Sequence, residues 1–155
     1  MIKIKIFRSK EAISNNLPKY QTRDAAGIDL TAAFKEKEII IKPNERALIP
    51  TGIYLSLPKN IEGQVRPRSG LALKFGLTVL NSPGTIDPDY KGEIKVILIN
   101  HGSDNQIIEN GMRVAQLVFS PIVKIKLVEV NELDISERGE KGFGSTGIGK
   151  QDEPR

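Results

Sequence analysis

The sequence predicts an all-β protein, a β-sandwich subunit of the jelly-roll type, on three observations. Turn residues are frequent, with 14 Gly and 9 Pro among 155 residues. Short β-branched runs lie between these turns, and several alternate apolar with polar residues as half-buried strands do. Helical periodicity is scarce. Many short strands at even spacing, separated by turns, are typical of sandwiches and jelly rolls.

Four strands and one helix are predicted in the first half of the chain. Residues 2–6 alternate Ile and Lys, which is the period of a half-buried strand. Short apolar runs, each closed by a nearby proline, predict three more strands at residues 39–41, 47–49 and 53–57. The helix is predicted at residues 69–75, where Ser69 could cap it and Gly76 could end it.

Three further strands are predicted in the second half. Residues 94–99 are nearly all apolar, which predicts an interior strand covered on both faces. Residues 114–119 are similar, but Gln116 interrupts them, and a buried amide needs hydrogen-bond partners in the protein or in a ligand. Residues 122–130 alternate again, with a phase slip that a β-bulge would explain.

The length fits one domain, predicted at residues 1–135 and followed by an arm at residues 136–155. Within the arm, residues 138–149 include five glycines among twelve residues and cannot build a core. Most glycine-rich ends are simply loose, and residues 151–155 are expected to be disordered. Alternatively, the arm could wrap a ligand, with backbone amides and hydroxyls toward anionic oxygens and the ring of Phe143 over a base.

Composition excludes several kinds of chemistry. There is no cysteine and a single histidine, so disulfides, thiolate catalysis and zinc sites with several Cys or His ligands are excluded. A metal would need oxygen ligands, which favours Mg²⁺. The net charge is +4 and there is no Trp, so we expect no basic-aromatic platform for nucleic acid. No apolar run is long enough to span a bilayer, and we expect a cytoplasmic protein without membrane partners.

Two segments contain candidates for binding a phosphate or a metal. Residues 66–72 place two arginines, Arg66 and Arg68, before Ser69 and Gly70 at the start of the predicted helix, where free amides and guanidinium donors favour anions. A capped helix with solvated arginines is the alternative. In residues 26–30, Asp29 could form a turn at a strand end or orient water on a metal ion.

Residues 81–93 form a turn-rich stretch that contains three acids and one tyrosine. A carboxylate on a loop that a rigid scaffold holds is suited to act as a general base. A hairpin also offers backbone donors and acceptors that could recognise the edge of a base. A polar turn, in which Asp and Pro serve turn chemistry only, is the alternative from these residues alone.

These segments occur together and in a fixed order. The five motifs are AGIDL at 26–30, RPRSGLA at 66–72, NSPGTIDPDYKGE at 81–93, RVAQ at 113–116 and RGEKGFGSTG at 138–147. With them the chain resembles the trimeric deoxyuridine triphosphatase (dUTPase) family over most of its length. Chance agreement of all five motifs is implausible, because the third and the fifth are long.

The resemblance implies a jelly-roll subunit in a homotrimer, with each active site shared by all three chains and closed by a flexible glycine-rich C-terminal arm. It implies Mg²⁺-assisted hydrolysis of dUTP to dUMP and pyrophosphate, in which a carboxylate-activated water attacks the α-phosphate. Such an activity limits uracil incorporation into DNA and supplies dUMP for dTMP synthesis.

The resemblance also implies residue roles. Asp87 matches the carboxylate that activates the attacking water, and Asp29 matches the acid that meets the water shell of Mg²⁺. The residues matched to the base and sugar are Asn81, Gly84, Thr85, Ile86, Tyr90, whose ring leaves no room for a 2′-hydroxyl, and Phe143, which covers uracil. The residues matched to the phosphates are Arg68, Ser69, Gly70, Gln116, Arg138, Gly144, Ser145 and Thr146.

Two other functions fit parts of the sequence. dCTP deaminase has a similar fold, but its relatives place a catalytic glutamate on the strand after the third motif, whereas residues 94–100 contain no acid. A non-catalytic dUTP-binding protein on the same scaffold would have no need of the carboxylate of Asp87. We therefore expect a hydrolase.

Overall fold

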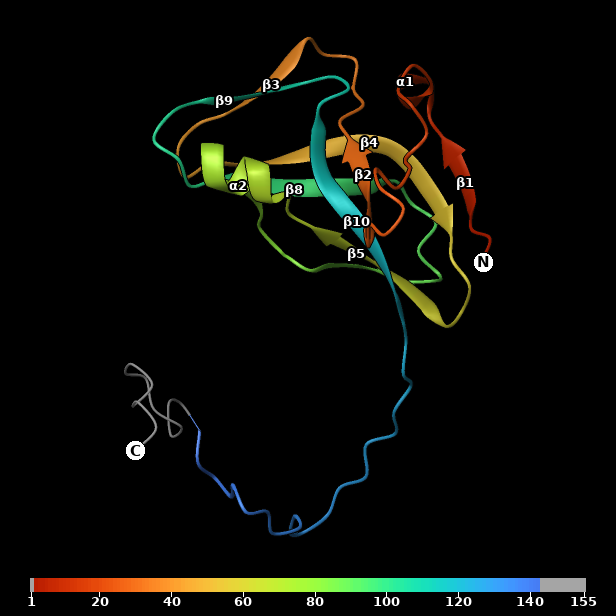
Figure 1. The fold of residues 1–155 in the computed structure, drawn as a ribbon, viewed down its shortest axis with the longest axis vertical. Coiled ribbons are helices and arrows are strands. Elements are labelled where there is room, and N and C mark those ends of the chain that lie inside the picture. The colour runs from red at the N-terminus through yellow and green to blue at the C-terminus, as the bar shows by residue number, and fades with distance from the viewer. Residues whose placement is uncertain (1, 143–155) are drawn as a thin grey trace. The chain divides into compact units, whose positions relative to one another are not determined.

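The computed structural model describes residues 2–142, and Figure 1 shows that short strands dominate it. Within these residues the strands are β1 (Lys5–Arg8), β2 (Gly27–Thr31), β3 (Glu38–Ile41), β4 (Arg46–Ser56), β5 (Ile61–Arg66), β6 (Leu77–Val79), β7 (Gly84–Ile86), β8 (Ile94–Asn100), β9 (Gln106–Glu109) and β10 (Arg113–Pro121). The helices are α1 (Lys10–Ile13) and α2 (Ser69–Phe75). The prediction of an all-β protein is confirmed.

The strands form two four-stranded antiparallel sheets and a separate ribbon. The first sheet has the order β1-β4-β8-β6, the second has the order β2-β10-β5-β7, and β3 pairs with β9 in the ribbon. Neighbours within a sheet come from distant parts of the chain, as β2 and β10 do (Figure 1). Such connections are those of a jelly roll, and the predicted fold class is confirmed.

The core lies between the inner faces of the two sheets. In the first sheet Val96 and Leu98 are almost completely buried, and they belong to the same apolar cluster as Leu30 and Leu117 of the second sheet. Successive residues of a strand point to opposite faces. The apolar positions therefore fix which side chains of each strand remain on the outer face, where the candidate site residues of the second sheet lie.

The prediction that residues 94–99 are covered on both faces is wrong for the single chain. Lys95 is exposed, and Ile97 and Ile99 are only partly buried. Exposed Leu48 of β4 lies opposite Ile97 in the register of the first sheet. One face of β8 packs in the core, while the other carries Lys95, Ile97 and Ile99 and stays partly open to solvent.

Strand β4 joins two predicted strands into one. It continues past Pro50, because the register against β8 shifts between Pro50 and Ile53. Gly52 has a φ of +62° at this irregularity, and its N–H donates to Oε1 of Glu93 at 2.8 Å. A register shift of this kind accommodates a proline, which cannot donate to the ladder.

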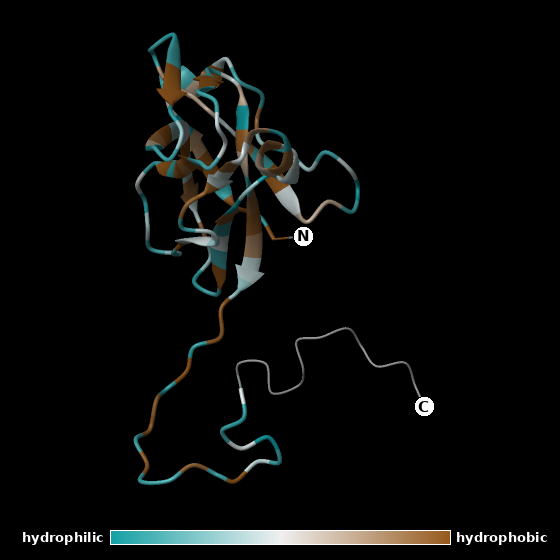
Figure 2. Ribbon diagram, turned by 90° about the vertical axis from the view of Figure 1, so that its left-hand side faces the viewer, coloured by the Kyte–Doolittle hydropathy of each residue, from teal (hydrophilic) through white to brown (hydrophobic). Residues whose placement is uncertain are grey.

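The chain divides into one unit that ends at Val123 and a second unit that begins at Lys124. The predicted strand at residues 122–130 is absent, because β10 ends at Pro121 and no ladder among residues 2–142 includes the residues beyond it. Backbone groups of a strand need a partner, which alternation alone does not supply. Figure 2 shows hydrophobic and hydrophilic residues alternating along this segment. Across residues 2–142, the helices are too short or too polar for a membrane crossing.

Candidate active site

The outer face of the second sheet brings the predicted phosphate and metal residues together. Gln116 in β10 lies in register with Asp29 in β2. A cavity of about 330 Å³ opens at this place. Its lining residues are Gln21, Ala25, Gly27, Asp29, Arg68, Ser69, Gly70, Arg113 and Gln116. Three motifs that are far apart in the sequence therefore meet in one polar cavity.

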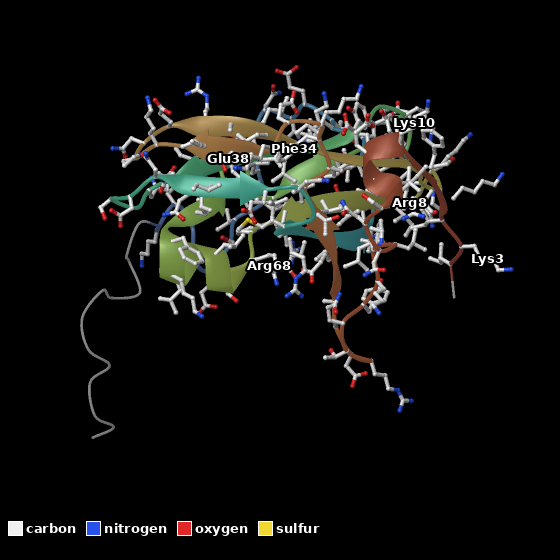
Figure 3. All side chains as sticks on the ribbon, turned by 90° about the horizontal axis from the view of Figure 1, so that it is seen from above. Lys3, Arg8, Lys10, Phe34, Glu38 and Arg68 are labelled. Carbon is white, nitrogen blue, oxygen red and sulfur yellow. The ribbon has the colours of Figure 1, made fainter. Side chains whose placement is uncertain are left out.

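Asp29 is clamped between two arginines. Its Oδ1 lies 3.0 Å from Nε of Arg68, and its Oδ2 accepts a hydrogen bond from Nη1 of Arg113 at 3.1 Å. The carboxylate is 14% exposed, so solvent screens these contacts less than it would at an open surface. Nη1 of Arg68 also donates to the backbone carbonyl of Arg113 at 3.2 Å. These contacts fix the guanidinium of Arg68, which Figure 3 shows beside α2.

Gln116 is held by the segment that precedes α2. Its Nε2 donates to the carbonyl of Pro67 at 2.9 Å, which supplies one of the partners that this half-buried amide needs. A Cβ at position 27 would lie 2.9 Å from Oε1 of Gln116, so Gly27 leaves the space that the amide occupies. A Cβ at position 70 would meet nothing within 4 Å, so the space beside Gly70 is open.

Helix α2 is confirmed at the predicted residues, but its start differs from the prediction. Arg68 rather than Ser69 occupies the N-cap position, with an extended backbone and no side-chain cap bond. Gly76 ends the helix in the left-handed conformation at φ +66°, as predicted. Buried Leu71 anchors the helix in the core, so Ser69 and Gly70 stay in the exposed first turn at the cavity.

A buried amide fixes the loop against which α2 ends. Asn100 is completely buried, and its Nδ2 donates to the carbonyls of Ile41 and Asp104 at 2.9 and 2.8 Å. Its Oδ1 accepts a hydrogen bond from the N–H of Gly102 at 2.8 Å. A Cβ on Gly76 would lie 2.5 Å from the nitrogen of Gly102, so the helix end and this loop pack in direct contact.

The residues matched to the base lie on the segment that contains β7. This strand pairs with β5, so that Gly84 lies opposite Val65. Gly84 is buried, and a Cβ there would lie 3.1 Å from Nδ2 of Asn81, which places the amide of Asn81 against the start of the strand. Thr85 is exposed and Ile86 is partly buried.

Asp87 and Tyr90 follow on a tight turn. The N–H of Tyr90 donates to the backbone carbonyl of Asp87 at 3.2 Å, and both side chains are exposed. The hydroxyl of Tyr90 donates to the carbonyl of Glu93 at 2.9 Å. A Cβ on Gly92 would lie 2.5 Å from that hydroxyl, so Gly92 permits this position of the ring. The carboxylate of Glu93 bonds to the amide of Gly52 and lies 3.5 Å from Nζ of Lys95, which makes it a pairing partner in the scaffold.

Within one chain, Asp87 does not join the cavity. On β5, Arg66 lies opposite Gln116 while Gly63 lies opposite Ile86, the residue before Asp87. Continuing this register places Asp87 level with Glu62, four residue steps along β5 from Arg66, which corresponds to about 13 Å along the sheet. A single chain therefore presents two separate halves of the predicted site.

The described part of the predicted arm has its own local structure. Nε of Arg138 donates to the carbonyl of Lys141 at 2.8 Å, and the N–H of Gly139 donates to the carbonyl of Ser136 at 3.0 Å. Gly139 has a φ of +54°, which favours glycine. The other predicted arm residues, Phe143, Gly144, Ser145 and Thr146, lie outside the described residues.

Comparison with known proteins decides the family. The family model described as dUTPase matches residues 14–147, which include all five motifs. The chain belongs to the dUTPase family. The deoxyuridine 5′-triphosphate nucleotidohydrolase of Caldanaerobacter subterraneus subsp. tengcongensis is 51% identical over 95% of this chain and 99% of its own length. This dUTPase is therefore a hydrolase of nucleotide metabolism that acts on dUTP, and not a deaminase or a non-catalytic binding protein.

Solved dUTPase structures share the fold. A point mutant of Staphylococcus bacteriophage 80alpha dUTPase with dUpNHpp is 26% identical and matches with a TM-score of 0.81 over 96% of this chain and 100% of that chain. A point mutant of the dUTPase from phage phi11 of S. aureus, described with a coordinated structural Mg(II) ion, is 22% identical. It matches with a TM-score of 0.75 over 86% of this chain and 100% of that chain, and it shows the fold alone.

Arg113 is a residue of the dUTPase cavity that sequence reasoning missed. It lies within the RVAQ motif, but the motif drew attention only to Gln116. The sequence signal that could have identified Arg113 is its charge at the start of a strand that is otherwise apolar except for Gln116. The β10–β2 register shifts between Arg113 and Ala115, and this irregularity accompanies the contact of Arg113 with Asp29.

Proposed function

We propose that this dUTPase hydrolyses dUTP to dUMP and pyrophosphate by attack of a water on the α-phosphate, with Asp87 as the general base. The observation that carries the proposal is the cavity that gathers Asp29, Arg68, Ser69 and Gln116 on one sheet face. Arginine guanidiniums and hydroxyls are suited to bind phosphate oxygens, because charge-assisted hydrogen bonds are strong.

Different residues act on the phosphates and on the attacking water. Gln116 binds at the α-phosphate, while Arg68, Ser69 and Gly70 bind phosphate oxygens and stabilise the charge of the leaving pyrophosphate. Asp87 takes a proton from the attacking water. From the arm, Arg138 and residues 144–146 enclose the phosphates.

The base and sugar are recognised by the segment around β7. Asn81 and residues 84–86 form hydrogen bonds with uracil, and a fixed set of donors and acceptors rejects cytosine because a mismatch leaves polar groups unpaired. The ring of Tyr90, held through its hydroxyl by the carbonyl of Glu93, lies under the deoxyribose and excludes a 2′-hydroxyl. Phe143 covers the uracil ring.

Mg²⁺ is proposed as the cofactor, held mainly by the substrate phosphates. When bound, it would fix the triphosphate conformation and neutralise its charge. The residues fit such an ion: each oxygen of Asp29 accepts one arginine contact and retains lone pairs for a metal-bound water. Within residues 2–142, no group of three or more His, Asp or Glu side chains could hold the ion by itself, and the proposal assigns its ligands to the triphosphate.

A homotrimer with shared sites is proposed because one chain leaves the site in two halves. Gln116 and Asp87 must both lie within a few ångströms of the α-phosphorus, and about 13 Å of sheet separates their rows. Apolar surfaces that need a partner support the assembly. They are the outer face of β8 and the exposed side chains of Val123, Ile125, Leu127, Val128, Val130, Leu133 and Ile135.

Mixing two inactive variants tests the shared site. Asp87→Asn and Arg68→Gln are each expected to lose turnover, whereas trimers that contain both chains are expected to regain it. If every site takes Asp87 and Arg68 from different chains of a cyclic trimer, each mixed trimer regains one site, so about a third of the sites in the doubly purified protein are active. The measurement is dUTP turnover of co-expressed chains with two different affinity tags, purified through both tags.

A mixture of two differently tagged Asp87→Asn chains serves as the control and is expected to stay inactive. Purified mixed oligomers that recover no activity would show that both residues act within one chain. If light scattering shows a monomer, and that monomer has full activity, the homotrimer itself is contradicted.

In the cell, this activity would keep dUTP low, which limits uracil incorporation into DNA, and would supply dUMP for dTMP synthesis. Because its substrate and product belong to nucleotide metabolism, we propose a cytoplasmic location.

A further inference from the structure

Arg66 lies in the same cross-strand row as two residues of the cavity. Gln116 of β10 lies opposite Asp29 of β2 on one side and opposite Arg66 of β5 on the other. Directly opposed residues project to the same face of a sheet, with Cβ atoms about 5 Å apart. The side chain of Arg66 therefore leaves β5 beside Gln116 on the outer face of the second sheet, where it is exposed.

Polar side chains along β5 hold the guanidinium of Arg66. Its Nε donates to Oε1 of Gln64 at 3.1 Å, and its Nη2 donates to the same oxygen. Nε2 of Gln64 donates in turn to Oε1 of Glu62 at 2.6 Å. Residues two apart in a strand share a face, so all three side chains lie on the outer face. The guanidinium is thereby held over the sheet between the cavity and the row of Asp87.

Arg66 differs from the nearby arginines Arg68 and Arg113 because no carboxylate among residues 2–142 pairs with it. Arg68 and Arg113 both contact Asp29 and occupy its two oxygens. Arg66 contacts the neutral amide of Gln64, and no ion pair among residues 2–142 includes it. An arginine has five N–H donors, so Arg66 retains three for another acceptor. Its charge therefore remains available to an anion.

We propose that Arg66 is a further phosphate-binding residue of this dUTPase, whose guanidinium takes an oxygen of the triphosphate that is bound at Gln116. Gln64 is its positioning residue. The inference rests on the proposed function, which places Gln116 at the α-phosphate. Arg66 belongs to the second motif but is not among the residues that the resemblance matches to the phosphates, and the register of the sheet places it beside Gln116.

Replacement of Arg66 tests this role. Arg66→Gln is expected to raise the KM for dUTP about tenfold, the effect of losing one hydrogen bond to a charged group. Inhibition by deoxyuridine, which has no phosphate, is expected to stay unchanged. Arg66→Lys keeps the charge without the planar fork and is expected to fall between wild type and Arg66→Gln. Lys59→Gln, which removes one positive charge from an exposed turn before β5, is the matched control with wild-type kinetics.

Three results would overturn the proposal. The first is an unchanged KM for dUTP in Arg66→Gln. The second is an equal weakening of deoxyuridine inhibition, which would indicate a general disturbance of the site. The third is dissociation of the oligomer in size-exclusion chromatography, which would make Arg66 an interface residue. Arg68→Gln separates this inference from the proposed function, because full turnover in that variant would refute the phosphate cavity whatever Arg66 does.

Discussion

Asp87→Asn is expected to bind dUTP like the wild type and to lose turnover by about 10²- to 10⁴-fold, the contribution typical of a general base. The amide has nearly the shape of the carboxylate but cannot take a proton from water. The turn itself should persist, because Tyr90 bonds to the backbone carbonyl of Asp87 rather than to its side chain. Equilibrium binding and single-turnover kinetics measure the two effects separately.

Asp89→Asn is the matched control for this experiment. Asp89 is exposed on the same turn and the substitution removes the same charge, so near wild-type turnover is expected. If Asp87→Asn keeps the wild-type kcat, Asp87 is not the general base. Loss of dUTP binding together with turnover would assign it a role in binding instead.

Deletion of residues 138–155 is expected to leave a folded protein whose kcat/KM for dUTP falls by about 10²-fold or more, as for the loss of a preorganised donor to the reacting groups. The deletion removes Arg138, Phe143 and the proposed phosphate-enclosing residues, and with them the closure that excludes water. The fold should survive, because the unit with the apolar core ends at Val123. Thermal melting and steady-state kinetics measure both outcomes.

A shorter deletion, of residues 151–155 alone, is the control and is expected to behave like the full chain. If deletion of residues 138–155 unfolds the protein, the segment belongs to the scaffold. If the truncated protein turns over dUTP normally, the arm has no part in catalysis.

The sequence predicted best the strands that have a strong pattern of their own. Residues 94–99 and 114–119 are each apolar except for one residue, and both lie within observed strands, β8 and β10. Strands β6 and β7 have three residues each and were not predicted, because pairing with β8 and β5 stabilises them rather than their own composition. Residues 122–130 show the converse, a strand pattern without a partner in the described chain.

The site was predictable as a set of residues but not as an arrangement. The motifs identified Asp29, Arg68 and Gln116, and the structure brings them to one cavity. The contact of Arg113 with Asp29 depends on the pairing of β10 with β2. These strands are far apart in the sequence, and no local pattern predicts that they pair. The distance between the rows of Gln116 and Asp87 likewise follows only from the register of β5 with both of its neighbours.

Incubation with Mg²⁺ and, separately, dUTP, dCTP, dTTP and UTP in H₂¹⁸O, with the products resolved by mass spectrometry, tests both the substrate and the atom that water attacks. We expect hydrolysis of dUTP alone, with unlabelled pyrophosphate and one ¹⁸O in dUMP, because water attacks the α-phosphorus. Label in the pyrophosphate would contradict attack at that atom. Ammonia release from dCTP, or no turnover of dUTP, would contradict the assigned reaction.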